Sequence, residues 1–137
     1  MKRERRWVVV AMVLGLLVLP ACKEAATEES SEAEPYTLEE IEGTDQVAVI
    51  LTAEGMERIG LETTTVDGST VPESAIWIDV EGIEWVYTNP APGRFVREQV
   101  EVDRYEDGVA ELADGLPAGT EVVSVGVPEL IGSEFGI

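Results

Sequence analysis

The sequence contains no histidine and only one cysteine, Cys22, among its 137 residues. The lack of histidine removes the commonest general base and metal ligand, and a single cysteine excludes an internal disulfide. Basic residues are also scarce: nine Lys and Arg stand against 28 Asp and Glu, which gives a net charge of −19. Because such a surface repels phosphate backbones and offers no polybasic patch, we expect neither a nucleic-acid partner nor electrostatic binding to anionic lipid.

Residues 1–21 have the organisation of a secretory signal peptide. A basic start, Met1–Arg6, is followed by the apolar run Trp7–Leu19, which is shorter than the roughly 20 residues of a bilayer span. The following Leu19-Pro20-Ala21-Cys22 resembles the lipobox of bacterial lipoproteins. That resemblance implies cleavage before Cys22, lipid attachment to its thiol, and an extracytoplasmic location in the cell envelope. A plain secretory signal that ends near a cysteine is the alternative.

Residues 22–44 are predicted to be the lipidated cysteine and a disordered acidic linker. The segment is rich in Glu, Ala, Ser and Thr, and so few core-forming residues cannot offset the entropy of ordering the chain. Its apolar exceptions, Tyr36, Leu38 and Ile41, are interpreted as incidental, with docking on a partner as the alternative.

Residues 45–137 are predicted to fold as one small, mainly β domain. Short β-rich runs alternate with turns that contain Gly, Pro or Asp, which is typical of a β-barrel. We expect six to seven short strands in a small closed or partly open barrel, with one short helix, Ala53–Ile59, between Thr52 as its cap and Gly60 as its stop. The expected strands are Gln46–Leu51, Leu61–Val66, Ala75–Val80, Trp85–Tyr87, Arg94–Val102, Val109–Leu112 and Glu121–Val127.

Two of these strands pose questions of side-chain direction. The alternation in Ala75–Val80 predicts a face made of Ile76, Ile78 and Val80. In Arg94–Val102, Phe95 points away from the valines, so either it lies on the opposite face or a bulge near Arg97 resets the phase. We favour the bulge, because a small barrel must bend its strands. The tail after Val127 is expected to pack back through Leu130, Ile131 and Phe135.

Four segments carry a resemblance to a known family: Val71-Pro72-Glu73-Ser74-Ala75, Trp85-Val86-Tyr87, Gly115-Leu116 with Gly119, and Val122-Val123 with Gly126. In this order they resemble the C-terminal, membrane-proximal domain of periplasmic adaptors (membrane fusion proteins) of resistance–nodulation–division efflux pumps. The resemblance implies a permuted Src-homology-3-like barrel and a part in multidrug or heavy-metal efflux. A full adaptor also has lipoyl, coiled-coil hairpin and further barrel parts, which have no counterpart here. The resemblance therefore implies a single-domain relative, whether an accessory subunit, a split adaptor or a remnant.

The first functional hypothesis is a lipid-anchored interaction module that contacts an inner-membrane efflux transporter or a full-length adaptor. Aromatic and arginine side chains anchor interfaces, although the aromatic ones can equally be core residues. The candidate contacts are Trp77, Trp85, Tyr87, Arg94, Phe95 and Arg97.

The alternative is an extracytoplasmic binding lipoprotein for a small ligand or cation. Hard cations could sit on Asp103, Glu106 and Asp107, but their spacing is not that of a calcium loop. Catalysis is not expected, because Ser74 has no histidine to activate it. We expect no cofactor and no metal centre.

Overall fold

The computed structural model describes residues 34–137, and this part of the chain is mainly β, as predicted. Its strands are β1 (Tyr36–Glu40), β2 (Val47–Leu51), β3 (Glu62–Thr65), β4 (Thr70–Pro72), β5 (Trp77–Ile78), β6 (Glu84–Ala91), β7 (Arg94–Val100), β8 (Val102–Glu106), β9 (Val109–Leu112) and β10 (Glu121–Val125). Its helices are α1 (Ala53–Ile59), the 3₁₀ helix η1 (Glu73–Ala75) and α2 (Val127–Phe135). None of these helices is long and apolar enough to span a bilayer.

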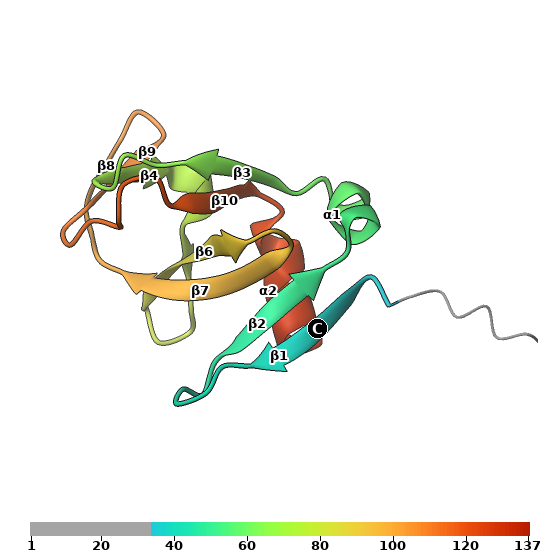
Figure 1. The fold of residues 1–137 in the computed structure, drawn as a ribbon. Helices are drawn as coiled ribbons and strands as arrows, with labels where there is room; N and C mark the ends of the chain where they lie inside the picture. Colours follow the sequence, from blue (N-terminus) through green and yellow to red (C-terminus); the bar gives the residue numbers. More distant parts are fainter. Residues whose placement is uncertain (1–33) are drawn as a thin grey trace, which may run out of the picture. The chain divides into compact units, whose positions relative to one another are not determined.

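The strands form two sheets rather than one barrel (Figure 1). The larger sheet has the order β1-β2-β7-β6-β10-β3, with β5 paired to β6, and the smaller sheet has the order β4-β9-β8. Because β1 and β3 stand at opposite edges of the larger sheet and do not pair, that sheet does not close. The described residues thus hold more strands than the six to seven expected, and a second helix.

The larger sheet is covered on both faces, so it has two cores. Successive residues of a strand point to opposite faces, and both Val86 and its neighbour Tyr87 are fully buried, as are Val122 and Val123. The sheet-side core contains Val86 and Val122 with residues of β4 and β9, and the helix-side core contains Tyr87 and Val123 with residues of β2 and α2. This arrangement explains why β6 and β10 have continuous apolar runs instead of simple alternation.

The two cores also settle the direction of Phe95. Phe95 belongs to the helix-side core and Val100 to the sheet-side core. The β6–β7 pairing runs without interruption through Tyr87↔Arg97, and the register shifts only between Thr88 and Ala91. The predicted bulge near Arg97 is therefore wrong. None is needed, because each face of the strand has its own core to fill.

Helix α1 forms as predicted. The Thr52 hydroxyl accepts a hydrogen bond from the backbone N–H of Gly55 at 3.0 Å, and Gly60 ends the helix in the left-handed conformation. Met56 and Ile59 pack against the helix-side core, on the face expected from their spacing.

The disordered linker predicted for residues 22–44, and with it the domain boundary at residue 45, is wrong for Tyr36–Glu40. These residues form β1, which pairs antiparallel with β2 over five positions, from Tyr36↔Leu51 to Glu40↔Val47. Four of the five are exposed and only Tyr36 packs against the helix-side core. Backbone hydrogen bonds to a sheet edge do not require apolar side chains, so composition could not reveal this strand. The rest of the predicted linker, up to residue 33, Cys22 and the signal peptide lie outside the described residues.

Two other predictions are corrected near β5. The strand expected at Ala75–Val80 is reduced to Trp77–Ile78, because Ala75 ends η1 and Asp79 begins a turn. Ile78 and Val80 are therefore exposed rather than part of a core face. The tail forms α2, in which Leu130 is buried and Ile131 packs against the helix-side core as expected.

Candidate functional site

An aromatic stack lies on the helix-side face of the sheet. Trp77 from β5 lies between Trp85 and Tyr87 of β6, with ring centroids 6.2 and 6.3 Å apart and nearly parallel planes. Phe135 at the end of α2 meets Trp77 edge-on at 6.3 Å. Such offset and edge-on arrangements contribute about 0.5–1.5 kcal/mol per pair beyond burial. Trp77, which the sequence places in a separate run, is therefore held on the same platform as the two aromatic residues of β6.

Arg97 of β7 completes this platform. Its guanidinium carbon lies 4.7 Å from the Trp85 ring centroid and 5.2 Å from that of Phe135, within cation–π range. Its Nε lies 3.1 Å from Oε1 of Glu134, but the N–H is not directed at that oxygen, so the contact is an ion pair rather than a hydrogen bond. The arginine therefore joins the sheet to α2.

Glu134 is the buried link between α2 and β6. Its side chain is only 3% exposed, and its Oε2 accepts a hydrogen bond of 2.6 Å from the Tyr87 hydroxyl. Burial, followed by this hydrogen bond and the charge of Glu134, raises the pKa of Tyr87 far above its usual value. Tyr87 stays protonated and remains a donor, so α2 is held by a charge-assisted hydrogen bond to the Glu134 carboxylate and by the ion pair with Arg97.

Asp79 shapes the turn that follows β5. Its Oδ1 accepts the backbone N–H groups of Glu81 and Ile83, and its Oδ2 accepts the indole N–H of Trp85, all at 2.9 Å. The hydrogen bond from Ile83, followed by that from Trp85, lowers the pKa of Asp79. The carboxylate thus stays ionised and fixes the turn against the aromatic platform.

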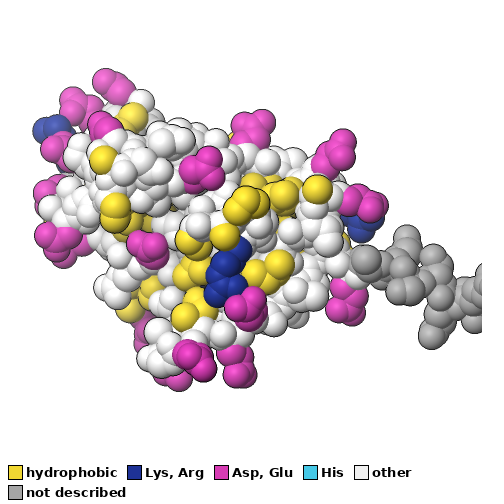
Figure 2. Space-filling model, viewed as in Figure 1, with side chains coloured by type: hydrophobic (Ala, Val, Ile, Leu, Met, Phe, Trp, Pro, Cys, Tyr) yellow, Lys and Arg dark blue, Asp and Glu magenta, His cyan; other side chains and the backbone are white. Residues whose placement is uncertain are grey.

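Between this turn and the end of α2 lies a hollow of about 540 Å³, which we call the β5–α2 groove. Its lining consists of Trp77, Ile78, Asp79, Val80, Glu81, Arg97, Ile131, Phe135 and Ile137. Four of these are strongly exposed hydrophobic residues: Ile78, Val80, Phe135 and Ile137. In the view of Figure 1 and Figure 2, α2 lies behind β2 and β7, and acidic groups are spread over the face of the molecule that is seen. Clustered exposed apolar residues of this kind mark interaction sites.

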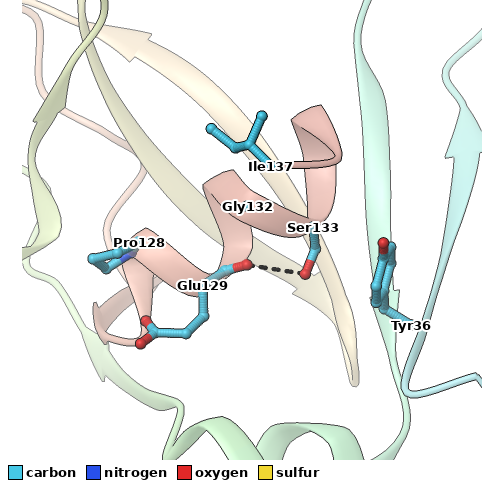
Figure 3. Close-up of a pocket in the computed structure, with 6 residues that line it drawn as sticks. All are labelled: Tyr36, Pro128, Glu129, Gly132, Ser133 and Ile137. Carbon is cyan, nitrogen blue, oxygen red and sulfur yellow. Dashed lines mark hydrogen bonds between the residues drawn. The ribbon is translucent and has the colours of Figure 1, made fainter.

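A second hollow, of about 360 Å³, lies between β1 and α2 and is drawn in Figure 3. Tyr36 faces α2 across it, and the Ser133 hydroxyl donates to the backbone carbonyl of Glu129 at 2.9 Å. That hydroxyl is engaged within its own helix, and the carboxylate of Glu129, also a lining residue, points away from it (Figure 3), so nothing drawn there activates Ser133 as a nucleophile.

The structure divides the six predicted contact residues into three groups. Trp77 and Arg97 line the groove. Tyr87 and Phe95 are fully buried, and Trp85 is 9% exposed, so the prediction that these three touch a partner is wrong: their rings support the groove or fill the core. Arg94 is not part of the groove lining and pairs with Glu39 of β1 at 2.8 Å.

Sequence reasoning missed the residues that make the groove apolar. Val80 and Ile78 look like core-facing strand residues, but Ile78 ends the two-residue strand β5 and Val80 lies in the turn that Asp79 closes, and both are exposed. The helical signal in α2 was available, since Val127, Leu130 and Ile131 recur at helical spacing, Pro128 stands in the first turn and Gly136 follows the last residue.

The candidate cation ligand Glu106 and the candidate nucleophile Ser74 are both engaged by neighbouring groups. Within residues 34–137 no group of three metal-ligating side chains comes together, and Glu106 is engaged by Arg104 at 3.4 Å. The Ser74 hydroxyl donates to the carbonyl of Ser124 at 2.9 Å.

No protein-family model matches the sequence, and no curated protein is significantly similar to it. The groove and its supporting residues therefore have to be judged on their own geometry.

Proposed function

We propose that this chain is a lipid-anchored, extracytoplasmic interaction module that docks on membrane transport machinery through the β5–α2 groove. The observation that carries the proposal is the exposed apolar lining of the groove, from Ile78 to Ile137, held open by a rigid aromatic and ionic support. Exposed apolar residues over a preorganised platform are what a protein–protein contact requires. The predicted signal peptide and the lipobox-like residues before Cys22 supply the anchor in this proposal.

The proposed partner is an inner-membrane efflux transporter or a full-length adaptor. The support is the resemblance of Val71–Ala75 and the later segments to the membrane-proximal domain of efflux adaptors. In this proposal the energy and the substrate pathway belong to the partner.

A small-ligand binding protein is the competing candidate, since 540 Å³ is within the usual range of ligand pockets. Ligand pockets, however, enclose most of the ligand surface. Here Val80 and Ile137 stand almost wholly in solvent, so the lining residues would cover only one side of a small molecule. This favours a larger partner, such as a protein, whose own surface would cover the exposed side of the groove.

A crosslinking pull-down from membranes tests the proposal, with tagged protein expressed at its native level. The expected result is recovery of an efflux transporter or an adaptor by the parent chain. A Cys22→Ser variant should leave the membrane fraction, lose the lipid mass and recover much less of that partner. If only free monomer returns, and deletion leaves drug and metal tolerance unchanged, the efflux role is wrong.

A further inference from the structure

We infer that the β5–α2 groove binds a protein segment whose apolar side chains are flanked by Lys or Arg. The inference deepens the proposed function and rests on it, because it states the chemistry of the partner segment. It is carried by charge complementarity together with the exposed apolar lining.

The described part of the chain has a strongly one-sided charge. Residues 34–137 contain 23 Asp and Glu and four Arg, which gives 4 − 23 = −19. Each arginine is already engaged by a carboxylate: the pairs are Arg58–Glu54, Arg94–Glu39, Arg97–Glu134 and Arg104 with Glu106 and Glu111. An acidic partner would therefore find no uncompensated cation among these residues.

The groove has the same polarity. Arg97, its one basic lining residue, is 16% exposed, lies against two rings and is compensated by Glu134. Glu81 at the rim has no ion-pair partner within residues 34–137, and Asp79 stays ionised next to it. A partner that contacts the apolar lining of the groove thus lies next to negative charge at the rim, which a lysine or arginine of the partner would neutralise.

Charge also argues against the other macromolecular occupants. A second copy would bring an equal charge of −19 from its described residues, and like charges brought together across an interface cost several kcal/mol. An anionic bilayer surface would be repelled in the same way. A segment that carries both apolar and basic side chains can contact the apolar lining of the groove and neutralise the carboxylates of Asp79 and Glu81 at its rim.

The test uses two matched peptides and the full chain in zwitterionic nanodiscs. Both peptides are amphipathic helices of about five turns with the same Leu and Phe face, one with Lys and the other with Glu on the polar face. Binding is followed by anisotropy of a labelled peptide, with empty nanodiscs subtracted. We expect the Lys peptide to bind at least about tenfold more tightly, and the preference to shrink at about 0.5 M salt, where charges are screened. Equal binding of the two peptides would overturn the inference.

Two rim variants separate the apolar contribution from the charge. Val80→Ser changes a fully exposed residue, so the fold should be unaffected while both peptides bind about fivefold more weakly. Glu81→Lys should remove most of the preference for the Lys peptide. Val109→Ser on β9, also exposed and outside the groove lining, is the matched control and should change neither value. Loss of affinity in the control equal to that in Val80→Ser would overturn the inference.

A second experiment places a photo-crosslinking residue at Val80 in cells, with Val109 as the control position. The expected adduct joins Val80 to a segment that has an apolar residue within about one helical turn of a Lys or Arg. An adduct to lipid, or to a segment without basic residues, refutes the inference. If the membrane pull-down recovers transport proteins but Val80 captures none of them, the transport role stands, and docking through the groove falls together with the groove inference. If the peptides bind as expected but the pull-down returns only monomer, the groove inference stands and the transport role falls.

Discussion

Replacing Glu134 with methionine should destabilise the protein far more than a surface substitution. Methionine has a similar length, so the change removes a charge and an acceptor without opening a large cavity. Arg97, 16% exposed, loses its carboxylate, and the buried Tyr87 hydroxyl loses its 2.6 Å acceptor. Removing one partner of a fully buried pair costs about 3–5 kcal/mol, and an orphaned hydroxyl about 1–3 kcal/mol. Because Arg97 is partly hydrated, we expect a total of about 2–4 kcal/mol.

Urea unfolding monitored by tryptophan fluorescence measures this loss as a lower midpoint at constant slope. For a domain of this size it corresponds to a fall in Tm of about 10–20 °C. Glu129→Met is the matched control, because Glu129 is an exposed residue of the same helix. It should change the free energy of unfolding by no more than about 0.5 kcal/mol.

The double variant Arg97→Met with Glu134→Met decides the physical cause. If the cost arises from an uncompensated buried charge, removing Arg97 as well restores about 1–2 kcal/mol, and the double variant is more stable than Glu134→Met alone. A double variant that is less stable than either single variant would refute this explanation. The interaction would then be packing of the arginine on Trp85 and Phe135 rather than charge compensation.

Three further changes test local features. A Gly→Ala change inside a helix usually stabilises it by up to about 1 kcal/mol. In Gly55→Ala, however, the new Cβ would collide with the carbonyl of Pro35 beside β1, so we expect a lower midpoint of urea unfolding. A higher midpoint would mean that Pro35 does not pack against α1. Thr52→Ala should cost about 1 kcal/mol through loss of the α1 cap, and Thr52→Ser should recover most of it in the same assay. Asp79→Asn should lower Tm, because it weakens the acceptor for Ile83 and Trp85. The pKa of Asp79 in the folded protein lies below the usual 3.8. The stabilisation that the ionised carboxylate gives is therefore complete above pH 3.8 and is lost as the pH falls through the folded pKa. Thermal melts of Asp79→Asn should lack this loss of stability in acid, and a pH profile of Tm equal to that of the parent chain contradicts the role given to Asp79.

The sequence alone determined the features that depend on neighbouring residues. The predominance of β structure follows from short apolar runs between turn residues, and α1 follows from Thr52, the spacing of Met56 and Ile59, and Gly60. The scarcity of basic residues, from which the partner chemistry is inferred, is likewise a property of composition.

Only the tertiary structure decided which face each residue occupies and what lies against it. Phe95 and Val100 fill different cores because both sides of β7 are covered, and a single strand's pattern does not say how many layers will cover it. Strand β1 forms because the edge of β2 offers backbone hydrogen-bond partners. The amino-acid composition of a segment does not show whether such an edge will be available to it. The groove depends on residues far apart in sequence, such as Trp77 and Phe135, and on the contacts of Glu134 that link α2 to the sheet. Contacts of this kind depend on long-range burial and pairing rather than on local propensity, so no local pattern in the sequence can reveal them.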